Sequence, residues 1–289
     1  MVKKAKPRKS GFAEVWRRYK KSKLALLGLG LLCVILFFTV FANLIVDYEE
    51  MAINQNTSIR LQPPSAAHWF GTDEYGRDIF ARIIYGARNS FLLAFTATAA
   101  ALAISVVIGS IAAYYGGLLD NVIMRMLDMF MGIPLLLLAI AISASLGPGM
   151  KNLIIAVTIA QVPGFTRVTR SAILNIVGME YIEAAKSYGT TDAGIIAFHI
   201  LPNAFGLIIV QATMSLASTI LTIASLSYIG LGMQPPAPEL GAMLSDGKEF
   251  MRYYPSLVIF PGLTIALSAL SLNLVGDGLR DALDPRLRN

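Results

Sequence analysis

The stretch LALLGLGLLCVILFFTVFANLIV, residues 24–46, runs for 23 residues without a charged side chain. A helix needs about 20 such residues to cross a bilayer, because lipid offers no hydrogen-bond partner to an exposed backbone. The run is too long for the hydrophobic region of a cleaved signal peptide, and no convincing small-residue cleavage site follows it. We therefore interpret residues 24–46 as an uncleaved first membrane-spanning helix.

The composition of the whole chain agrees with this interpretation. Of its 289 residues, 55% are hydrophobic and 15% are charged, which is too apolar for a soluble domain of this length. Ten of the 24 Lys and Arg residues lie within residues 1–23. Such a basic segment orients a membrane protein and contacts anionic lipid, so we predict a membrane-lipid partner and no nucleic acid. The single cysteine, Cys33, lies inside the apolar run, which excludes an intrachain disulfide.

Five further apolar segments predict an all-α polytopic membrane protein with six transmembrane helices. They cover approximately residues 90–114, 129–146, 152–177, 204–232 and 255–276. The segment 152–177 is the weakest, because Gln161, Pro163, Arg167 and Arg170 interrupt it. Polar and helix-breaking residues at membrane depth are expected to face protein or water rather than lipid.

The distribution of basic residues predicts how these spans are oriented. With the N-terminus inside, the cytoplasmic segments hold 17 Lys and Arg residues and the outer segments hold 7. Both termini are therefore predicted to be cytoplasmic. Pro63 and Pro64 predict irregular structure in the outer loop, with a short interfacial helix. The expected organisation is a basic segment 1–23, a first span 24–46, an outer loop 47–89, a five-helix core 90–276 and a tail 277–289.

A cytoplasmic loop at residues 178–203 interrupts this core and has a pattern of its own. Glu183 and Lys186 are three residues apart in a helix-compatible stretch, so they are neighbours on one helix face. Gly189 then separates a second short helix, which Thr191 or Asp192 can cap at its N-terminus. The loop is much longer than a simple connection between two spans requires.

Two interpretations of this loop follow from the residues alone. Ala184 and Ala185 would leave a low surface that another protein can approach closely, which favours a compact docking element. Alternatively, the two short helices only cover the ends of the spans. In both cases the second helix is expected to end before Pro202, which starts the next span.

The same loop resembles the EAA loop of permease subunits of ATP-binding-cassette importers. The matching residues are Glu183, Ala184, Ala185, Gly189, Leu201 and Pro202. The family usually has isoleucine two residues before the Leu-Pro pair, where this chain has His199. In this respect the chain is similar to the His-Ile-Leu-Pro-Asn version of the peptide and nickel permease branch.

Other stretches resemble the same branch and extend the likeness to nearly everything after residue 65. Residues 68–90 carry its outer-loop signature, and residues 114–140, 227–247 and 261–289 are also similar. The signature residues in this chain are Gly71, Thr72, Asp73, Gly76, Arg77 and Asp78. The likeness is closest to the C-type permeases of dipeptide and oligopeptide importers.

The resemblance implies a type I importer permease fold and several partners. These are a second homologous permease, two ATPase subunits that bind ATP and Mg²⁺, and an extracytoplasmic solute-binding protein. The EAA loop would form coupling helices that insert into a groove of an ATPase, so that ATPase closure moves the spans as a rigid body. The implied location is the cytoplasmic membrane of a bacterium or archaeon. The implied cargo is a di- or oligopeptide, with nickel or a metal chelate as the alternative, and the substrate-contacting residues are not legible.

The absence of certain motifs limits the chemistry of this chain. Gly247-Lys248-Glu249 is the nearest approach to a phosphate-binding loop, and its last position is wrong. We therefore predict no catalytic residue and no bound cofactor in this chain. His68 and His199 are predicted on opposite sides of the membrane, so they cannot share a metal. Without an intramembrane acid and histidine relay, a secondary carrier is the less favoured alternative.

Two groups of charged residues have more than one interpretation. Asp73, Arg77 and Asp78 could grip a binding protein, or form a local ion pair and turn with Gly71 and Gly76. The outer-loop glycines favour the structural role.

Three charged residues inside the predicted core also have two interpretations each. Asp128 could line a translocation route or pair with Arg125, three residues away. Arg167 and Arg170 are expected to extend to the inner surface, with a pore role as the alternative.

Overall fold

The computed structural model describes residues 11–283, and this part of the chain is helical, with one isolated β-bridge between Thr72 and Asp78. The basic residues of segment 1–10, and Arg286 and Arg288 of the tail, lie outside the described residues. The elements are α1 Gly11–Tyr19, α2 Lys23–Val40, α3 Ala42–Ile45, the π-helix η1 Tyr48–Ile53, the 3₁₀-helix η2 Thr57–Ile59, α4 Ile79–Tyr115, α5 Gly117–Met131, α6 Leu135–Leu146, α7 Met150–Val177, α8 Glu180–Ser187, α9 Asp192–Gly194, the π-helix η3 Ile195–Ile200, α10 Leu201–Tyr228, α11 Leu240–Gly247 and α12 Ser256–Leu283.

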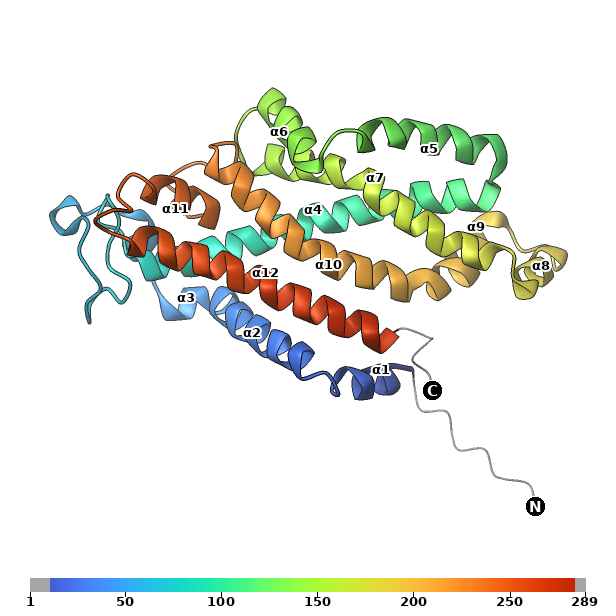
Figure 1. The fold of residues 1–289 in the computed structure, drawn as a ribbon, viewed down its shortest axis with the longest axis horizontal. Coiled ribbons are helices and arrows are strands. Elements are labelled where there is room, and N and C mark those ends of the chain that lie inside the picture. The colour runs from blue at the N-terminus through green and yellow to red at the C-terminus, as the bar shows by residue number, and fades with distance from the viewer. Residues whose placement is uncertain (1–10, 284–289) are drawn as a thin grey trace, which may run out of the picture.

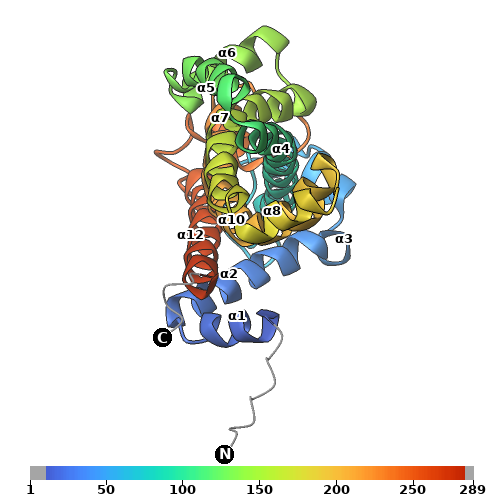
Figure 2. The ribbon, with the colours of Figure 1, turned by 90° about the vertical axis from the view of Figure 1, so that its right-hand side faces the viewer.

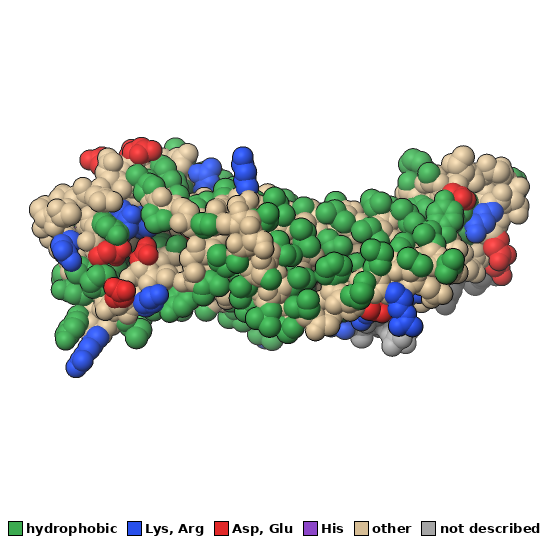
Figure 3. Space-filling model, turned by 90° about the horizontal axis from the view of Figure 1, so that it is seen from above, with side chains coloured by type: hydrophobic (Ala, Val, Ile, Leu, Met, Phe, Trp, Pro, Cys, Tyr) green, Lys and Arg blue, Asp and Glu red, His purple; other side chains and the backbone are tan. Residues whose placement is uncertain are grey.

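The long helices α4, α7, α10 and α12 run along the long axis of an elongated bundle (Figure 1). One end, here named the loop end, carries residues 47–78 and α11, and the opposite end, named the α8 end, carries α8, α9 and η3. Charged side chains gather toward these two ends, and the long middle of the surface is mostly hydrophobic (Figure 3). An apolar band between two polar ends is the surface that a bilayer requires.

The N-terminal helices pack against the last helix of the chain. Viewed from the α8 end, α1, α2 and α12 occupy one edge of the bundle, and α5 and α6 the other (Figure 2). A Cβ atom at Gly28 of α2 would lie 2.5 Å from Cβ of Leu274, and one at Gly278 of α12 would lie 2.3 Å from Cβ of Ala25. Small residues let membrane helices approach closely, so these glycines permit the contact. The predicted span 24–46 is interrupted at Phe41, which separates α2 from α3.

Helix α4 begins eleven residues earlier than the predicted span at residue 90. Asp78 caps its N-terminus, because Oδ1 accepts a hydrogen bond of 2.8 Å from the backbone N–H of Ala81. Arg82 lies in the part of α4 that was predicted as loop. In the structure the Arg82 guanidinium is buried and donates to the carbonyl of Ala52 at 2.9 Å. The loop predicted over 47–89 therefore ends at residue 78.

The third span differs from the single helix predicted over 129–146. In its place lie two helices, α5 and α6, whose axes are bent by 85°. The break falls at residues 132–134, where Gly132 closes α5 and Pro134 precedes α6. Proline cannot continue the hydrogen-bond pattern of a preceding helix, which explains the interruption. Helix α5 itself begins directly after α4, so Arg125 lies in a helix rather than in a connecting loop.

The remaining long helices match the predicted spans more closely. Helix α7 occupies 150–177, and α12 continues to Leu283, beyond the predicted end at 276. Within residues 11–283, four helices are long and apolar enough to cross a membrane, and the count is five if the bent pair of α5 and α6 forms one span. Helix α7 is 28 residues long and packs between α4, α6 and α10, although its polar residues keep it outside this group. The count of six spans stays a prediction.

Hydroxyl and amide groups tie the centre of the bundle together. The Thr219 hydroxyl of α10 lies 3.1 Å from Oε1 of Gln161 in α7 and 3.2 Å from the Thr98 hydroxyl in α4. All three side chains are buried. Gln161 thus faces protein rather than lipid, as the sequence predicted for the interruptions of this span.

Candidate functional site

The EAA loop forms a short helical turn at the α8 end of the bundle. Gly189 follows α8 with a φ of +78°, a conformation that side chains disfavour and glycine accepts. The Thr191 hydroxyl then caps the next helix by accepting from the N–H of Gly194. The two-helix prediction is confirmed in this respect. The second helix differs from the prediction, because α9 and η3 continue into α10 through Leu201 and Pro202 without a break.

Buried contacts hold this turn firmly against the long helices. Ile182, Ile195 and Ile200 are fully buried in a cluster shared with α4, α7 and α10. The Tyr114 hydroxyl of α4 donates to Oδ1 of Asp192 at 2.6 Å. A displacement of α8 would therefore be passed directly to the helices beneath it.

The outer side of the turn presents aromatic and acidic groups. Tyr188 is 90% exposed and Phe198 78% exposed, and Glu183 and Ala184 are also exposed. Ala185 is buried, so only the first alanine of the pair belongs to the accessible surface. Exposed aromatic side chains in a rigid turn are typical of a docking surface for another protein.

Two residues of the loop have other roles in the structure. The Lys186 ammonium lies 4.8 Å from the centre of the Tyr114 ring, where it makes a cation–π contact rather than an ion pair with Glu183. The carbonyl of His199 accepts from the side chain of Asn203, and the imidazole is half-buried.

The outer-loop signature folds into a buried turn at the loop end. Gly71 and Gly76 adopt φ values of +85° and +75°. Between them, Oδ1 of Asp73 accepts from the backbone N–H groups of Tyr75 and Arg77, both at 2.9 Å. The Arg77 side chain closes the turn with a bond of 2.7 Å from Nε to Oδ2 of Asp73. The local ion pair and turn, one of the two predicted interpretations, is the arrangement observed.

The other signature residues anchor this turn to its neighbours. The Thr72 hydroxyl donates to the carbonyl of Ile59 and accepts from the N–H of Gln62 at 2.8 Å. Asp78, besides capping α4, lies 2.8 Å from Nδ1 of His68. Thr72 and Asp78 are buried, so neither side chain is available to grip a partner.

A group of charges joins this turn to α11. Nε of Arg82 lies 3.3 Å from Oδ2 of Asp73. Glu74 and Asp246 lie beside the same guanidinium, around a narrow cleft. Burial raises the pKa of both Glu74 and Asp246 above the ordinary carboxyl value. The Arg77 charge partly opposes the rise at Glu74, and the Arg82 and Arg77 charges partly oppose it at Asp246. Sequence spacing could not predict this group, because Asp246 is far from the others along the chain.

A fully buried carboxyl, Glu239, was also missed by the sequence analysis. Its Oε2 caps α11 by accepting from the N–H of Ala242, and its Oε1 accepts from the Ser90 hydroxyl at 2.8 Å. Asn89 donates to the carbonyl of Pro238 at 2.7 Å. Burial raises the pKa of Glu239. These contacts hold the segment before α11 against α4.

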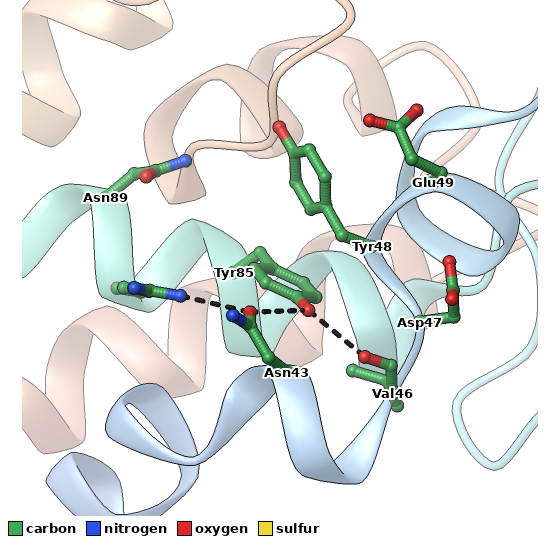
Figure 4. Close-up of a pocket in the computed structure, with 8 residues that line it drawn as sticks. Asn43, Val46, Asp47, Tyr48, Glu49, Tyr85 and Asn89 are labelled. Atoms are coloured by element: carbon green, nitrogen blue, oxygen red, sulfur yellow. Dashed lines mark hydrogen bonds between the residues drawn. The ribbon is translucent and has the colours of Figure 1, made fainter.

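An open polar cavity of about 440 Å³ lies beside these elements at the loop end (Figure 4). The Tyr85 hydroxyl is a hydrogen-bond donor with two acceptors in reach, Oδ1 of Asn43 and the carbonyl of Val46, each at 3.0 Å. Carboxylates of Asp47 and Glu49 lie at its rim. The cavity is therefore lined by hydrogen-bonding and charged groups, and it lies next to the end of the first span.

Two ion pairs join α5 to α7, and one of them corrects the predicted partner of Asp128. Asp128 pairs with Arg167 rather than with Arg125. Arg170 makes a bidentate pair with Asp120. Both arginines therefore end on carboxylates of the neighbouring helix, and Asp120 lies in the first turn of α5. The expectation that Arg167 and Arg170 extend to the inner surface stays a prediction.

Within residues 11–283 no group of three or more His, Cys, Asp and Glu side chains could hold a metal ion. The His68 loop and the His199 helix lie at opposite ends of the bundle (Figure 1). The prediction that these two histidines cannot share a metal agrees with this separation.

The long apolar helices define a multi-pass membrane protein, and the α8 turn protrudes at one end of it. Residues 105–289 match the family described as "Binding-protein-dependent transport system inner membrane component". Residues 10–64 match the "N-terminal TM domain of oligopeptide transport permease C". The chain therefore belongs to the family of binding-protein-dependent permeases, and it is a permease subunit of an ATP-binding-cassette transporter whose ATPase is a separate subunit.

Several relatives are similar over almost the whole chain. A dipeptide transport system permease protein DppC of Alkalihalophilus pseudofirmus is 46% identical over 97% of this chain and 91% of its own length. A glutathione transport system permease protein GsiD of Pectobacterium atrosepticum is 42% identical over 96% and 91%. A di/tripeptide transport system permease protein DppC of Pseudomonas aeruginosa is 39% identical over 97% and 94%.

A solved structure shows the same fold. A chain of the MetNI methionine ABC transporter, in an inward-facing conformation, superposes with a TM-score of 0.58 at 18% identity. The match covers 70% of this chain and 97% of that chain. The predicted ABC importer permease fold is confirmed.

Proposed function

We propose that this chain forms half of the translocation pathway of an ATP-driven importer of di- and oligopeptides. The observation that carries the proposal is the rigid α8 turn, whose aromatic outer side faces away from the bundle and whose inner side is buried against the long helices. The relatives named for dipeptides, for di/tripeptides and for glutathione support a peptide cargo. Nickel, the alternative raised by the sequence, has no comparable support.

The α8 end is the cytoplasmic end in this proposal, and the loop end is extracytoplasmic. The excess of basic residues in the predicted cytoplasmic segments supports this orientation. The described chain ends also agree, because α1 and the end of α12 lie on the α8 side of the bundle (Figure 1). The membrane is the cytoplasmic membrane of a bacterium or archaeon.

The partners follow from this orientation. Two ATPase subunits, which bind ATP and Mg²⁺, dock at the cytoplasmic end, one of them on the α8 turn of this chain. A solute-binding protein docks at the loop end, and a second homologous permease covers part of the exposed apolar surface. The coupling residues of this chain are those of the EAA loop: Glu183, Ala184, Ala185, Gly189, His199, Leu201 and Pro202.

The continuity of η3 with α10 supports a mechanism for coupling. When the ATPases close, α8 moves with the groove that holds it. Because α9, η3 and α10 form one uninterrupted helix from Asp192 to Tyr228, the motion is carried into the membrane as a rigid-body displacement. The two permeases then alternate between inward-facing and outward-facing states.

The test uses the complete reconstituted transporter in proteoliposomes. We expect Glu183→Lys or Gly189→Leu to leave the complex inserted but to uncouple peptide uptake from ATP hydrolysis. Asp277→Lys is the matched control, because this exposed acid of α12 lies toward the same end but outside the turn. Uptake that stays at the wild-type level in both loop variants would refute the assigned role.

A further inference from the structure

One face of α10 carries a line of polar side chains. Gln211, Ser215, Ser218, Thr222 and Ser225 follow one another at intervals of four and three residues, the spacing of a single helix face. All five are exposed or half-buried in this chain. The helix therefore presents an uncovered polar face along much of its length.

This face connects two cavities at opposite ends of the bundle. The cavity at the α8 end has a volume of about 590 Å³, and Asn203 and Leu207 of α10 line it together with Arg280 of α12. The cavity at the loop end has a volume of about 380 Å³ and includes Leu221 and Ser225 of α10. Helix α10 lies between α7 and α12 (Figure 1), and its polar face extends from the cavity at one end of the bundle toward the cavity at the other.

Helix α7 carries a second line of polar side chains. Arg167, Ser171 and Asn175 are exposed and share one face of the helix. Asn175 lines the same cavity at the α8 end as Asn203. The exposed faces of α7 and α10 thus border a common space.

The ion pair of Arg167 with Asp128 lies on this α7 face at considerable depth. Arg167 is ten residues before the end of α7, and Asp128 is eleven residues after the start of α5. At 1.5 Å per residue, both lie about 15 Å from the α8 end of their helices. Helix α7 has 28 residues and a length of about 42 Å, so about 12 Å of it extends beyond a hydrocarbon layer of about 30 Å, and the pair still lies inside that layer. Their side chains are nevertheless 50% and 44% exposed. An exposed ion pair at this depth is costly against lipid, so it faces water or protein.

We propose that the polar faces of α7 and α10 line the translocation pathway, and that Arg167 and Asp128 bind the carboxylate and ammonium ends of the passing peptide. The inference rests on the proposed peptide import. Guanidinium groups pair with carboxylates in a two-point geometry, and a carboxylate pairs with an ammonium. A peptide with free ends can replace both partners of the resting pair at once, without net loss of ion pairs.

The hydroxyl groups of α10 fit the same role. Ser218, Thr222 and Ser225 each donate to a carbonyl of their own helix, at 2.8 to 2.9 Å, so none depends on a partner protein. Their oxygen atoms still accept hydrogen bonds from peptide N–H groups or water. Such a surface recognises peptide backbone and ends while tolerating different side chains.

The first experiment measures uptake by the reconstituted transporter with its ATPases and binding protein. We expect Arg167→Gln and Asp128→Asn each to lower uptake of an unmodified dipeptide about tenfold or more, because each loses a charge-assisted contact. Basal ATP hydrolysis and complex yield should stay at wild-type values. For a dipeptide with an amidated carboxyl end, Arg167→Gln should cause no further loss. Lys151→Gln, which removes an exposed charge from the other end of α7, is the matched control.

Each other outcome has a defined meaning. Uptake within twofold of wild type in both variants overturns the role of the pair. Loss of the assembled complex overturns it as well, because the pair then belongs to the contact between permeases. A wild-type transporter that carries no peptide refutes the proposed function instead.

A second experiment tests the polar faces without changing the ion pair. After Cys33→Ser, single cysteines replace Ser218 or, as a control, Phe95, an apolar residue of α4 that is 62% exposed. Phe95 lies three residues from Thr98, whose hydroxyl contacts Thr219, so its depth is similar to that of Ser218. A charged, membrane-impermeant thiol reagent should modify the cysteine at 218 at least tenfold faster than that at 95, and dipeptide transport should slow this modification. Equal, slow modification at both positions overturns the pathway assignment.

Discussion

Removing the carboxylate of Asp73 should open the outer loop while leaving the membrane helices intact. In Asp73→Ala, two guanidinium groups lose their partner, Nε of Arg77 at 2.7 Å and Nε of Arg82 at 3.3 Å. Their side chains are 2% and 5% exposed, so water cannot replace the lost charge. Breaking a buried ion pair by deleting one partner typically costs about 3–5 kcal/mol. The population of the locally opened loop should therefore rise roughly a hundredfold to a few thousandfold.

Trypsin cleavage in detergent measures this opening directly. Arg77 is buried in the native loop and Arg82 in the first turn of α4, so cleavage requires the loop to open at Arg77, or the start of α4 to open with it at Arg82. The cleavage rate, followed by mass spectrometry of the N-terminal fragment, should rise in proportion to the open population. The cleavage rate of Asp73→Asn should lie between those of wild type and the alanine variant. Asparagine keeps an oxygen that accepts from the two backbone N–H groups, but it lacks the charge that pairs with the arginines.

Glu74→Gln provides the matched control for this experiment. Glu74 is the adjacent acid of the same turn, and its carboxylate lies 3.8 Å from the Arg77 guanidinium, too far for a strong pair. Since burial raises the pKa of Glu74, the loss of its charge should leave the loop as closed as wild type or more so. If Asp73→Ala is cleaved no faster than this control, the ion pairs do not hold the loop, and the reasoning is refuted.

Three further predictions concern the packing and titration of the bundle. Gly241→Ala should lower the melting temperature, with a cost of about 1–3 kcal/mol, because its methyl group would lie 2.2 Å from a carbonyl oxygen of α10; Gly262→Ala, with 3.7 Å to the nearest heavy atom, should not. Burial raises the pKa of Asp246, so its contribution to stability is fully present below the ordinary carboxyl pKa and is lost as pH rises through the raised one. Melting temperatures measured from pH 4 to 8 should show this decline, and Asp246→Asn should flatten it. Thr219→Val should cost about 1 kcal/mol by removing contacts between three helices, whereas Thr222→Val should melt like wild type.

Much of the candidate site could be predicted from local sequence. Gly189 and the Thr191 cap indicated a two-helix turn, because glycine and threonine act on the backbone within a few residues of themselves. Gly71 and Gly76 likewise indicated a tight turn around Asp73. Such features need no knowledge of distant segments. Where the second helix ends was different, since Pro202 is compatible with both a break and the first turn of a helix.

The membrane class and the family of this chain were determined by its sequence alone. An apolar run such as residues 24–46 is enough to place a helix in the membrane, because the free energy of transferring each side chain into lipid depends little on its neighbours. The EAA residues and the outer-loop signature are contiguous, so they are visible without a fold.

Only the tertiary structure decided which charges meet. Spacing along one helix offers partners three or four residues away, which suggested Arg125 for Asp128. The actual partner, Arg167, lies on another helix, and the 85° bend between α5 and α6 is part of how α5 is placed beside α7. The burial of Arg82, Glu239 and Asp246 has the same origin, since each becomes favourable only when separate segments bring hydrogen-bonding groups around it. Which charged residues of two helices pair depends on how the helices pack, and the sequence of one helix does not contain this information.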